Sequence, residues 1–341
     1  MTRRAVAAAL SALALWAAPL MAGTHDAPPP SDQATTDTPS PRAPLPAEVV
    51  ELREKDARVL TLGYRLATGN ARFCDDRTFS AGLLLHDMAA YGSGETLRTL
   101  LGLGGDVGVQ ALVPGGPAEA AGLRVDDTVL GIGDMVFADI PSSESKPWDR
   151  IETIRAEAER LLRETGTLPI TIIRSGAPVT RIIEGVPACA SRFEIGEGTR
   201  AVADGHRIVI GPDFAGVDYP DPLLAAVLAH ELAHNVLRHR AWHEANGGRK
   251  QATVRLTERE ADRLMPWLLV NAGFAPEAAS QFMKRWGPRH GGWIFRARSH
   301  DGWDERAEFI EAEFAPIDAA RAADGTADWS RHFRREALPE G

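Results

Sequence analysis

The segment AVLAHELAHNVLRH, residues 226–239, limits what this chain can fold into more than any other segment. Its apolar residues are almost continuous, which predicts a buried helix over residues 222–245. Three polar side chains, His230, Glu231 and His234, fall inside this apolar run, and burying a polar group costs free energy unless a partner compensates it. Residues four apart share one face of a helix, so both histidines can point at one metal ion. The segment therefore predicts a metal-binding helix, and the alternative is a buried helix whose histidines have protein partners.

Zinc is the metal that this pattern favours. Neutral imidazole is a good zinc ligand, and two histidines leave room for a third ligand and a water molecule. Glu231 lies about 100° round the helix from His230, beside the metal position instead of on it. There it can take a proton from the attacking water and pass it to a leaving amine. His239, at the polar end of the helix, is expected at the protein surface.

A third ligand is predicted on a second helix, over residues 252–272. In the segment TEREAD, Glu258 and Asp262 are four apart and share one face, whereas Glu260 points to the other side. Glu258 is the candidate zinc ligand, and Asp262 can hold the second N–H of a ligand histidine. The alternative is a solvated charged helix, which the neighbouring arginines favour: Arg255, Arg259 and Arg263.

The N-terminus predicts export. Residues 1–23 begin with two arginines, continue with an apolar run and end in small residues, which is typical of a secretory signal peptide. A membrane anchor is the alternative, but the run is short for a span. Residues 24–47 are rich in Pro, Ser, Thr and Asp and predict a disordered linker. With arginine-rich and alanine-rich usage, we expect a bacterial periplasmic protein, or an N-terminally anchored one.

Composition excludes some partners. The net charge is −9 and no basic stripe is present, so a nucleic-acid partner is not expected. No segment after the N-terminal run is apolar and long enough to cross a bilayer, so no transmembrane span is expected in the mature chain.

The middle of the chain predicts a separate domain over residues 79–185. It follows an N-terminal helical region, residues 48–78, whose helix should end near residues 68–70. Within it, PGGPAEAAGLRVDDTVLGIGD resembles the most recognisable segment of PDZ domains, PGSPAxxAGLxxGDxIxxxxG. Asp127 stands at the usual Asp, and Asp126 replaces the Gly before it. The resemblance implies a small β-sandwich or barrel that binds chain termini or exposed segments, or one that gates a neighbouring site.

A second resemblance covers residues 190–312 well and residues 48–78 weakly. HELAH followed by E-x-x-A-D resembles the gluzincin metallopeptidases of the HtpX, BepA and CAAX prenyl endopeptidase family. AVADGHRIVIG, NAGFAPEAA and SHDGWDERAEFI resemble three further segments of that family. The fold class implied is α+β: a mainly helical zincin-type domain with a small strand edge over residues 186–341, plus the inserted PDZ-like domain.

The same resemblance implies roles for individual residues. One zinc ion per chain is held by His230, His234 and Glu258, with Glu231 as the base. His300 matches a histidine that faces the metal in that family and either stabilises the transition state or occupies the fourth coordination site. Arg306 matches an arginine that supports that region. Met265-Pro266 departs from the family pattern, and a proline inside a helix predicts a kink one turn after the ligand, which affects the position of Asp262.

Together these features predict an exported zinc metalloendopeptidase that acts on polypeptides in envelope protein quality control. A substrate strand is expected to add at the cleft edge along Arg207, Ile208, Val209 and Ile210. The main alternative is a catalytically silent PDZ-bearing chaperone or adaptor for misfolded envelope proteins. A third is a zinc-dependent esterase or another small-molecule hydrolase.

The two cysteines, Cys74 and Cys189, are predicted to form a disulfide. They are the only cysteines, and an exported chain meets an oxidising compartment. They also flank the inserted domain, which must leave and re-enter its host at neighbouring points. Their Cα atoms should therefore lie within about 7 Å. The alternative is two free thiols that pack as small apolar groups.

Overall fold

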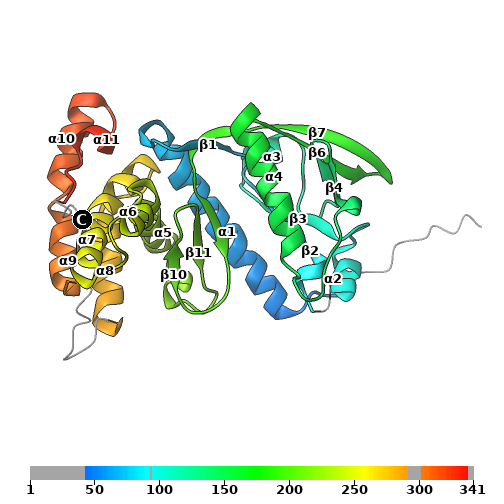
Figure 1. Cartoon of the computed structure of the whole chain (residues 1–341), viewed down its shortest axis with the longest axis horizontal. Coiled ribbons are helices and arrows are strands. Elements are labelled where there is room, and N and C mark those ends of the chain that lie inside the picture. Colours follow the sequence, from blue (N-terminus) through cyan, green and yellow to red (C-terminus); the bar gives the residue numbers. More distant parts are fainter. Residues whose placement is uncertain (1–42, 93, 291–300, 337–341) are drawn as a thin grey trace, which may run out of the picture. The chain divides into compact units, whose positions relative to one another are not determined.

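Helix α1 organises the computed structural model, which describes residues 43–92, 94–290 and 301–336. It spans Ala47–Asn70 (Figure 1), as the sequence predicts, and its buried residues recur at helical spacing. Its second half packs in the largest apolar core through Val59, Leu62 and Leu66. Its first half faces the inserted domain, where Gln110 donates a buried hydrogen bond of 2.8 Å to Asp56.

The inserted segment leaves and re-enters its host at one place. Strand β1 (Arg77–Ser80) pairs antiparallel with β8 (Val186–Cys189), with Arg77 opposite Cys189. Directly beside this pair, Cys74 and Cys189 form a disulfide, with their Cα atoms 5.6 Å apart. The predicted disulfide is therefore confirmed, and it closes the base of the insertion.

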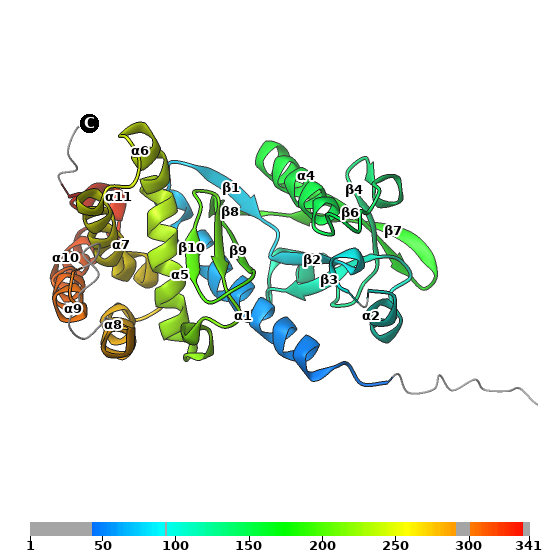
Figure 2. The same cartoon turned by 60° about the horizontal axis from the view of Figure 1, so that its bottom comes forward.

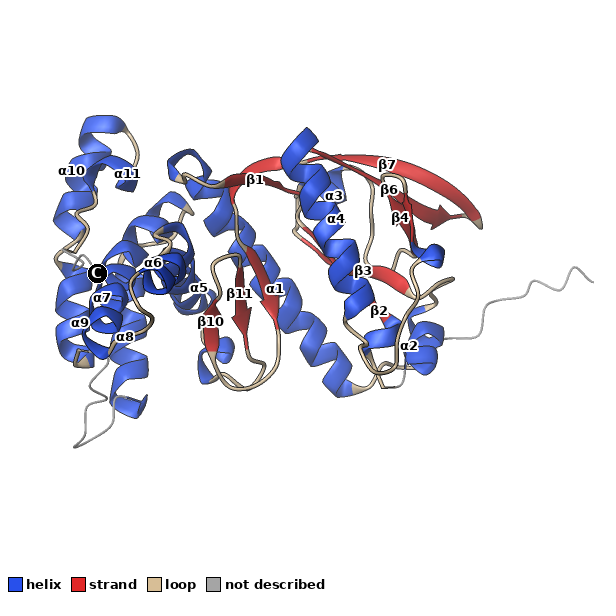
Figure 3. Cartoon of the chain, in the orientation of Figure 1, coloured by secondary structure: helices blue, strands red, loops and turns tan. Residues whose placement is uncertain are grey.

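Between β1 and β8 the chain builds its own apolar core, which draws its members from residues 81–183. Two small sheets surround it: β2 pairs with β3, and four strands follow the order β5-β4-β6-β7 (Figure 3). The sequence resemblance predicts a sandwich or barrel here, but no sheet of the described residues closes into a barrel. The elements are β2 Leu83–Asp87, α2 Gly94–Leu101, β3 Val107–Leu112, α3 Pro117–Ala120, β4 Val129–Ile132, β5 Met135–Val136, α4 Asp149–Thr165, β6 Thr167–Arg174 and β7 Ala177–Glu184.

After β8 the chain returns to a mainly helical unit. A three-stranded sheet comes first, in the order β10-β11-β9, and lies between α1 and α5 (Figure 2). The described part of the molecule is thus a mixed α+β structure with small sheets. The elements are β9 Arg192–Ile195, β10 Ala201–Ala203, β11 Arg207–Ile210, α5 Asp221–Val236, α6 His239–Ala245, α7 Gln251–Asn271, α8 Glu277–His290, α9 Trp303–Glu311, α10 Phe314–Asp324 and α11 Trp329–His332.

Two details of these helices differ from the expectations. The single helix predicted over 222–245 is two helices, because Arg238 takes a left-handed backbone conformation with φ 57° between α5 and α6. The helix predicted over 252–272 is α7, and it continues through Pro266 without interruption. Four short 3₁₀ helices complete the described elements: Ala71–Phe73, Met88–Ala90, Phe137–Asp139 and Ala215–Asp218.

No helix among the described residues is long and apolar enough to span a bilayer.

Candidate metal centre

Helices α5 and α7 pack together and bring His230, His234 and Glu258 into one group. The two histidine Nε2 atoms are 3.2 Å apart. Glu258 places one carboxylate oxygen 3.4 Å from His230 Nε2 and the other 3.5 Å from His234 Nε2. Ligand atoms that share a tetrahedral zinc ion at about 2.0–2.1 Å lie about 3.3–3.4 Å from one another. The donor atoms and their spacing therefore fit a zinc ion.

His230 is backed by a second carboxylate. Its Nδ1 atom lies 3.1 Å from Oδ1 of Asp262, a residue that is almost fully buried. Arg306 of α9 donates two hydrogen bonds to Asp262, of 2.6 and 2.8 Å. Burial opposes ionisation of Asp262, but Arg306 and His230 outweigh it and hold its pKa below the usual range. Asp262 is thus a fixed negative charge behind the histidine, despite the proline one turn later.

The electrostatics of the group favour a cation. Burial lowers the pKa of His230, but contacts with Asp262 and Glu258 outweigh burial and raise this pKa to about 10. At His234 burial prevails and lowers the pKa to about 3, so this imidazole is neutral at physiological pH. A pocket in which two carboxylates stabilise positive charge on a ring nitrogen also stabilises a divalent cation there.

Glu231 lies beside the group on α5 and is half-buried. Burial raises the pKa of its carboxyl to about 7, and the backbone N–H of Ala203 in β10 partly opposes this rise. A pKa near the working pH is the property that a general base needs. Among the described residues, the group that could hold a metal ion consists of His230, His234 and Glu258, and Glu231 is not part of it.

His239 and Glu260 are residues whose setting sequence reasoning missed. His239 was expected at the surface, but only 2% of it is exposed, because the reversal at Arg238 folds α6 back toward α7. Its Nδ1 lies 2.8 Å from Nδ1 of His234, and its Nε2 lies 3.0 Å from Oε2 of Glu260. Glu260 does point away from the face of Glu258, but it is fully buried there. The contact between His239 and Glu260 is hard to predict from the sequence. Arginine rarely adopts the left-handed conformation, so nothing at Arg238 indicates that the chain turns there.

The predicted substrate strand is in a different position from the one expected. Residues Arg207–Ile210 form β11, which pairs with β10 on one side and with β9 on the other. Its backbone groups already pair with β10 and β9, and the side chains of Ile208 and Ile210 are fully buried. A substrate strand therefore cannot add to β11. Among the described strands of this sheet, β10 and β9 are the edges.

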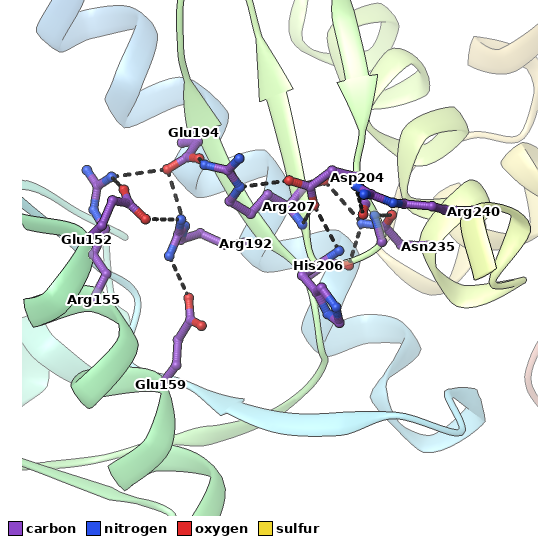
Figure 4. A network of polar contacts seen from close by, with 12 residues as sticks. Glu152, Arg155, Glu159, Arg192, Glu194, Asp204, His206, Arg207, Asn235 and Arg240 are labelled. Carbon is purple, nitrogen blue, oxygen red and sulfur yellow. Dashed lines mark hydrogen bonds and ion pairs between the residues drawn. The ribbon is translucent and has the colours of Figure 1, made fainter. Parts of the chain in front are cut away.

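The Arg207 side chain belongs to a polar network that joins the sheet to the inserted domain (Figure 4). It contacts Asp204 at 2.8 Å and Glu194 at 3.3 Å. From β9, Arg192 reaches α4 of the inserted domain, where it pairs with Glu152 and Glu159, each at 2.8 Å. Several of these side chains line a cleft of ≈ 690 Å³, and His230, His234 and Glu258 are not among its lining residues. The network thus connects β9 and β11 to α4 through ion pairs.

Some predicted positions lie outside the described residues. His300 is one, so its relation to the metal group stays a prediction. The predicted signal peptide, residues 1–23, and nearly all of the predicted linker lie outside them too.

Comparisons of this chain with protein-family models, with curated proteins and with solved structures gave no match.

Proposed function

We propose that this protein is an exported zinc metalloendopeptidase, with a PDZ-like domain inserted into a zincin-type catalytic unit. The observation that carries the proposal is the group His230, His234 and Glu258, whose donor atoms lie 3.2 to 3.5 Å apart beside Glu231. This donor set is the one that a catalytic zinc ion takes: three protein ligands and an open fourth position.

The residues have separate tasks in the proposed reaction. His230, His234 and Glu258 hold one zinc ion, which when bound supplies Lewis acidity toward water and a peptide carbonyl. Glu231 accepts the proton of the attacking water and returns it to the leaving nitrogen, for which its pKa of about 7 is suited. Asp262 fixes the orientation of the His230 ring.

A substrate would bind in extended form along β10, Ala201–Ala203. This strand is an edge of its sheet, and the backbone N–H of Ala203 within it is close enough to the Glu231 carboxyl to oppose the rise that burial causes in its pKa. A polypeptide that added there would bring its backbone past the proposed base. The substrate would thus add as a strand to β10 and not to β11, again by backbone pairing at a sheet edge.

The inserted domain offers a second place for a polypeptide. An apolar groove of ≈ 230 Å³ runs beside β2 and α4, and it is also lined by α1 residues, among them Leu60 and Tyr64. We propose that it takes chain ends or exposed segments of unfolded proteins. Because α1 also packs in the catalytic core, an occupant of the groove would touch both units.

The decisive experiment is digestion of casein by the mature protein, with and without a zinc chelator, beside Glu231→Gln as matched control. We expect cleavage that the chelator stops, that added zinc restores and that Glu231→Gln lacks. Suppression of aggregation without cleavage would indicate the adaptor instead. Cleavage of small esters but not of casein would indicate the small-molecule hydrolase.

A further inference from the structure

The second ring nitrogen of His234 has a buried partner. While Nε2 faces Glu258 and His230, Nδ1 lies 2.8 Å from Nδ1 of His239. His239 in turn places Nε2 3.0 Å from a carboxylate oxygen of Glu260. The three side chains thus form one line of contacts that runs from the metal-binding group to a fully buried carboxylate.

Chemistry allows one direction of hydrogen bonding along this line when His234 binds a metal. Nε2 of His234 then offers its lone pair, so the ring proton is on Nδ1 and is donated. His239 Nδ1 must accept it, which puts the proton of His239 on Nε2, where Glu260 accepts it. We propose that His239 and Glu260 are positioning residues that hold His234 in its metal-binding tautomer and orientation, an inference that rests on the proposed zinc site.

Glu260 suits this task because its charge is held in place. The C-terminal Arg335 donates to it through Nε at 2.6 Å and through Nη2 at 2.9 Å, and the backbone N–H of Glu336 donates at 2.9 Å. The acceptor at the end of the line is therefore a fully buried side chain that three backbone and guanidinium N–H groups hold in place.

The two ligand histidines are thus supported in parallel ways. Behind His230 stand Asp262 and then Arg306, and behind His234 stand His239, then Glu260 and Arg335. The difference is the imidazole of His239, which lies between His234 and the carboxylate of Glu260. This line of contacts also connects Arg335, near the C-terminal end of the described residues, to the proposed metal site.

The test is zinc affinity, measured by competition with a chelator, for the wild type, His239→Leu, His239→Gln and Glu260→Gln. His243→Leu is the matched control, because His243 is a buried histidine of the same helix that contacts Thr257 at 3.2 Å and no ligand. Loss of a residue behind a metal ligand typically weakens metal binding by about 10–100-fold. We expect such a loss for His239→Leu, a smaller loss for Glu260→Gln and none for His243→Leu.

The glutamine variant separates positioning from packing. An amide can accept from His234 and donate to Glu260, so His239→Gln should recover most of the affinity, which a role in packing alone does not predict. Nitrogen-15 NMR of the zinc-loaded wild type adds a direct reading: His239 should carry its proton on Nε2. A proton on Nδ1 of His239, or equal affinity in His239→Leu and wild type, would overturn the inference. A wild type that binds no zinc would instead refute the proposed function and the positioning role together.

Discussion

Cys74 and Cys189 are bonded to each other although they are 115 positions apart in the sequence, and the whole inserted segment lies between them. The bond lies beside the β1–β8 pair, and both cysteines belong to the same apolar core as the second half of α1. It therefore links the start and the end of the inserted segment covalently, at the place where that segment leaves and re-enters the rest of the chain.

Removal of this disulfide should destabilise the protein substantially. The chain-entropy model gives about 4–5 kcal/mol for a loop of this length, less any strain in the native state. We expect Cys74→Ala/Cys189→Ala to lower the free energy of unfolding by 2–5 kcal/mol, in the range typical of such losses. Urea denaturation of the oxidised wild type and of the double variant measures it, and equal midpoints would contradict the expectation.

Zinc content should depend on each ligand and not on the base. We expect one zinc ion per chain in the wild type and in Glu231→Gln, and little in His234→Ala or Glu258→Gln, because two remaining ligands hold zinc weakly. Elemental analysis after dialysis measures the content. Full occupancy in His234→Ala would remove this residue from the ligand set.

Glu231→Gln should separate binding from hydrolysis. The amide keeps the shape of the side chain but cannot accept a proton, and loss of a general base typically costs about 10²–10⁴ in rate. We expect kcat on a peptide substrate to fall by this factor while KM changes little. Near-normal turnover at full zinc content would exclude Glu231 as the base.

His86 of the inserted domain should make stability depend on pH. Burial lowers the pKa of this nearly buried imidazole to about 3, below its ordinary value of 6.5, and the charge of Arg53 lowers it further. Below pH 6.5, His86 binds a proton in the unfolded chain but stays neutral in the folded chain. The contribution of neutral His86 to the free energy of unfolding is therefore fully present above pH 6.5 and is lost as the pH falls toward 3.

The free energy of unfolding should fall by about 1.4 kcal/mol for each pH unit within this range. Comparison with His86→Leu isolates this effect from that of Asp56, whose pKa burial raises to about 6 and which therefore acts in the opposite direction. Between pH 6.5 and 5, the wild type should lose about 2 kcal/mol of unfolding free energy relative to the variant. Parallel urea curves at the two pH values measure it, and an unchanged difference would be the contrary result.

Asp126 should show the cost of a left-handed backbone. It has φ 67° at the position where the PDZ pattern has glycine, and it pairs with Arg53 at 2.7 Å. Asp126→Gly and Asp126→Ala lose that ion pair equally, but only glycine adopts this φ without steric cost. We expect the glycine variant to be more stable by about 1–2 kcal/mol, measured by thermal unfolding. Two variants of equal stability would show that the turn relaxes in solution.

Much of the local structure follows from the sequence because it depends on near neighbours. The apolar spacing in 48–70 predicts α1, and the turn at Gly205 predicts the β10–β11 pair. Helical geometry alone puts His230 and His234 on one face of α5, and Glu258 and Asp262 on one face of α7. The disulfide could be predicted because only two cysteines exist and an insertion brings its ends together.

The surroundings of those residues depend on contacts between distant segments, which periodicity does not encode. β11 is central and not an edge because β9 pairs with it from the other side. His239 is buried because the chain reverses at Arg238, and Glu260 is buried because the C-terminal Arg335 covers it. The sequence by itself determined which side chains share a helix face. Only the tertiary structure decided which of those faces meet, because burial and pairing are set by packing between segments far apart in the chain.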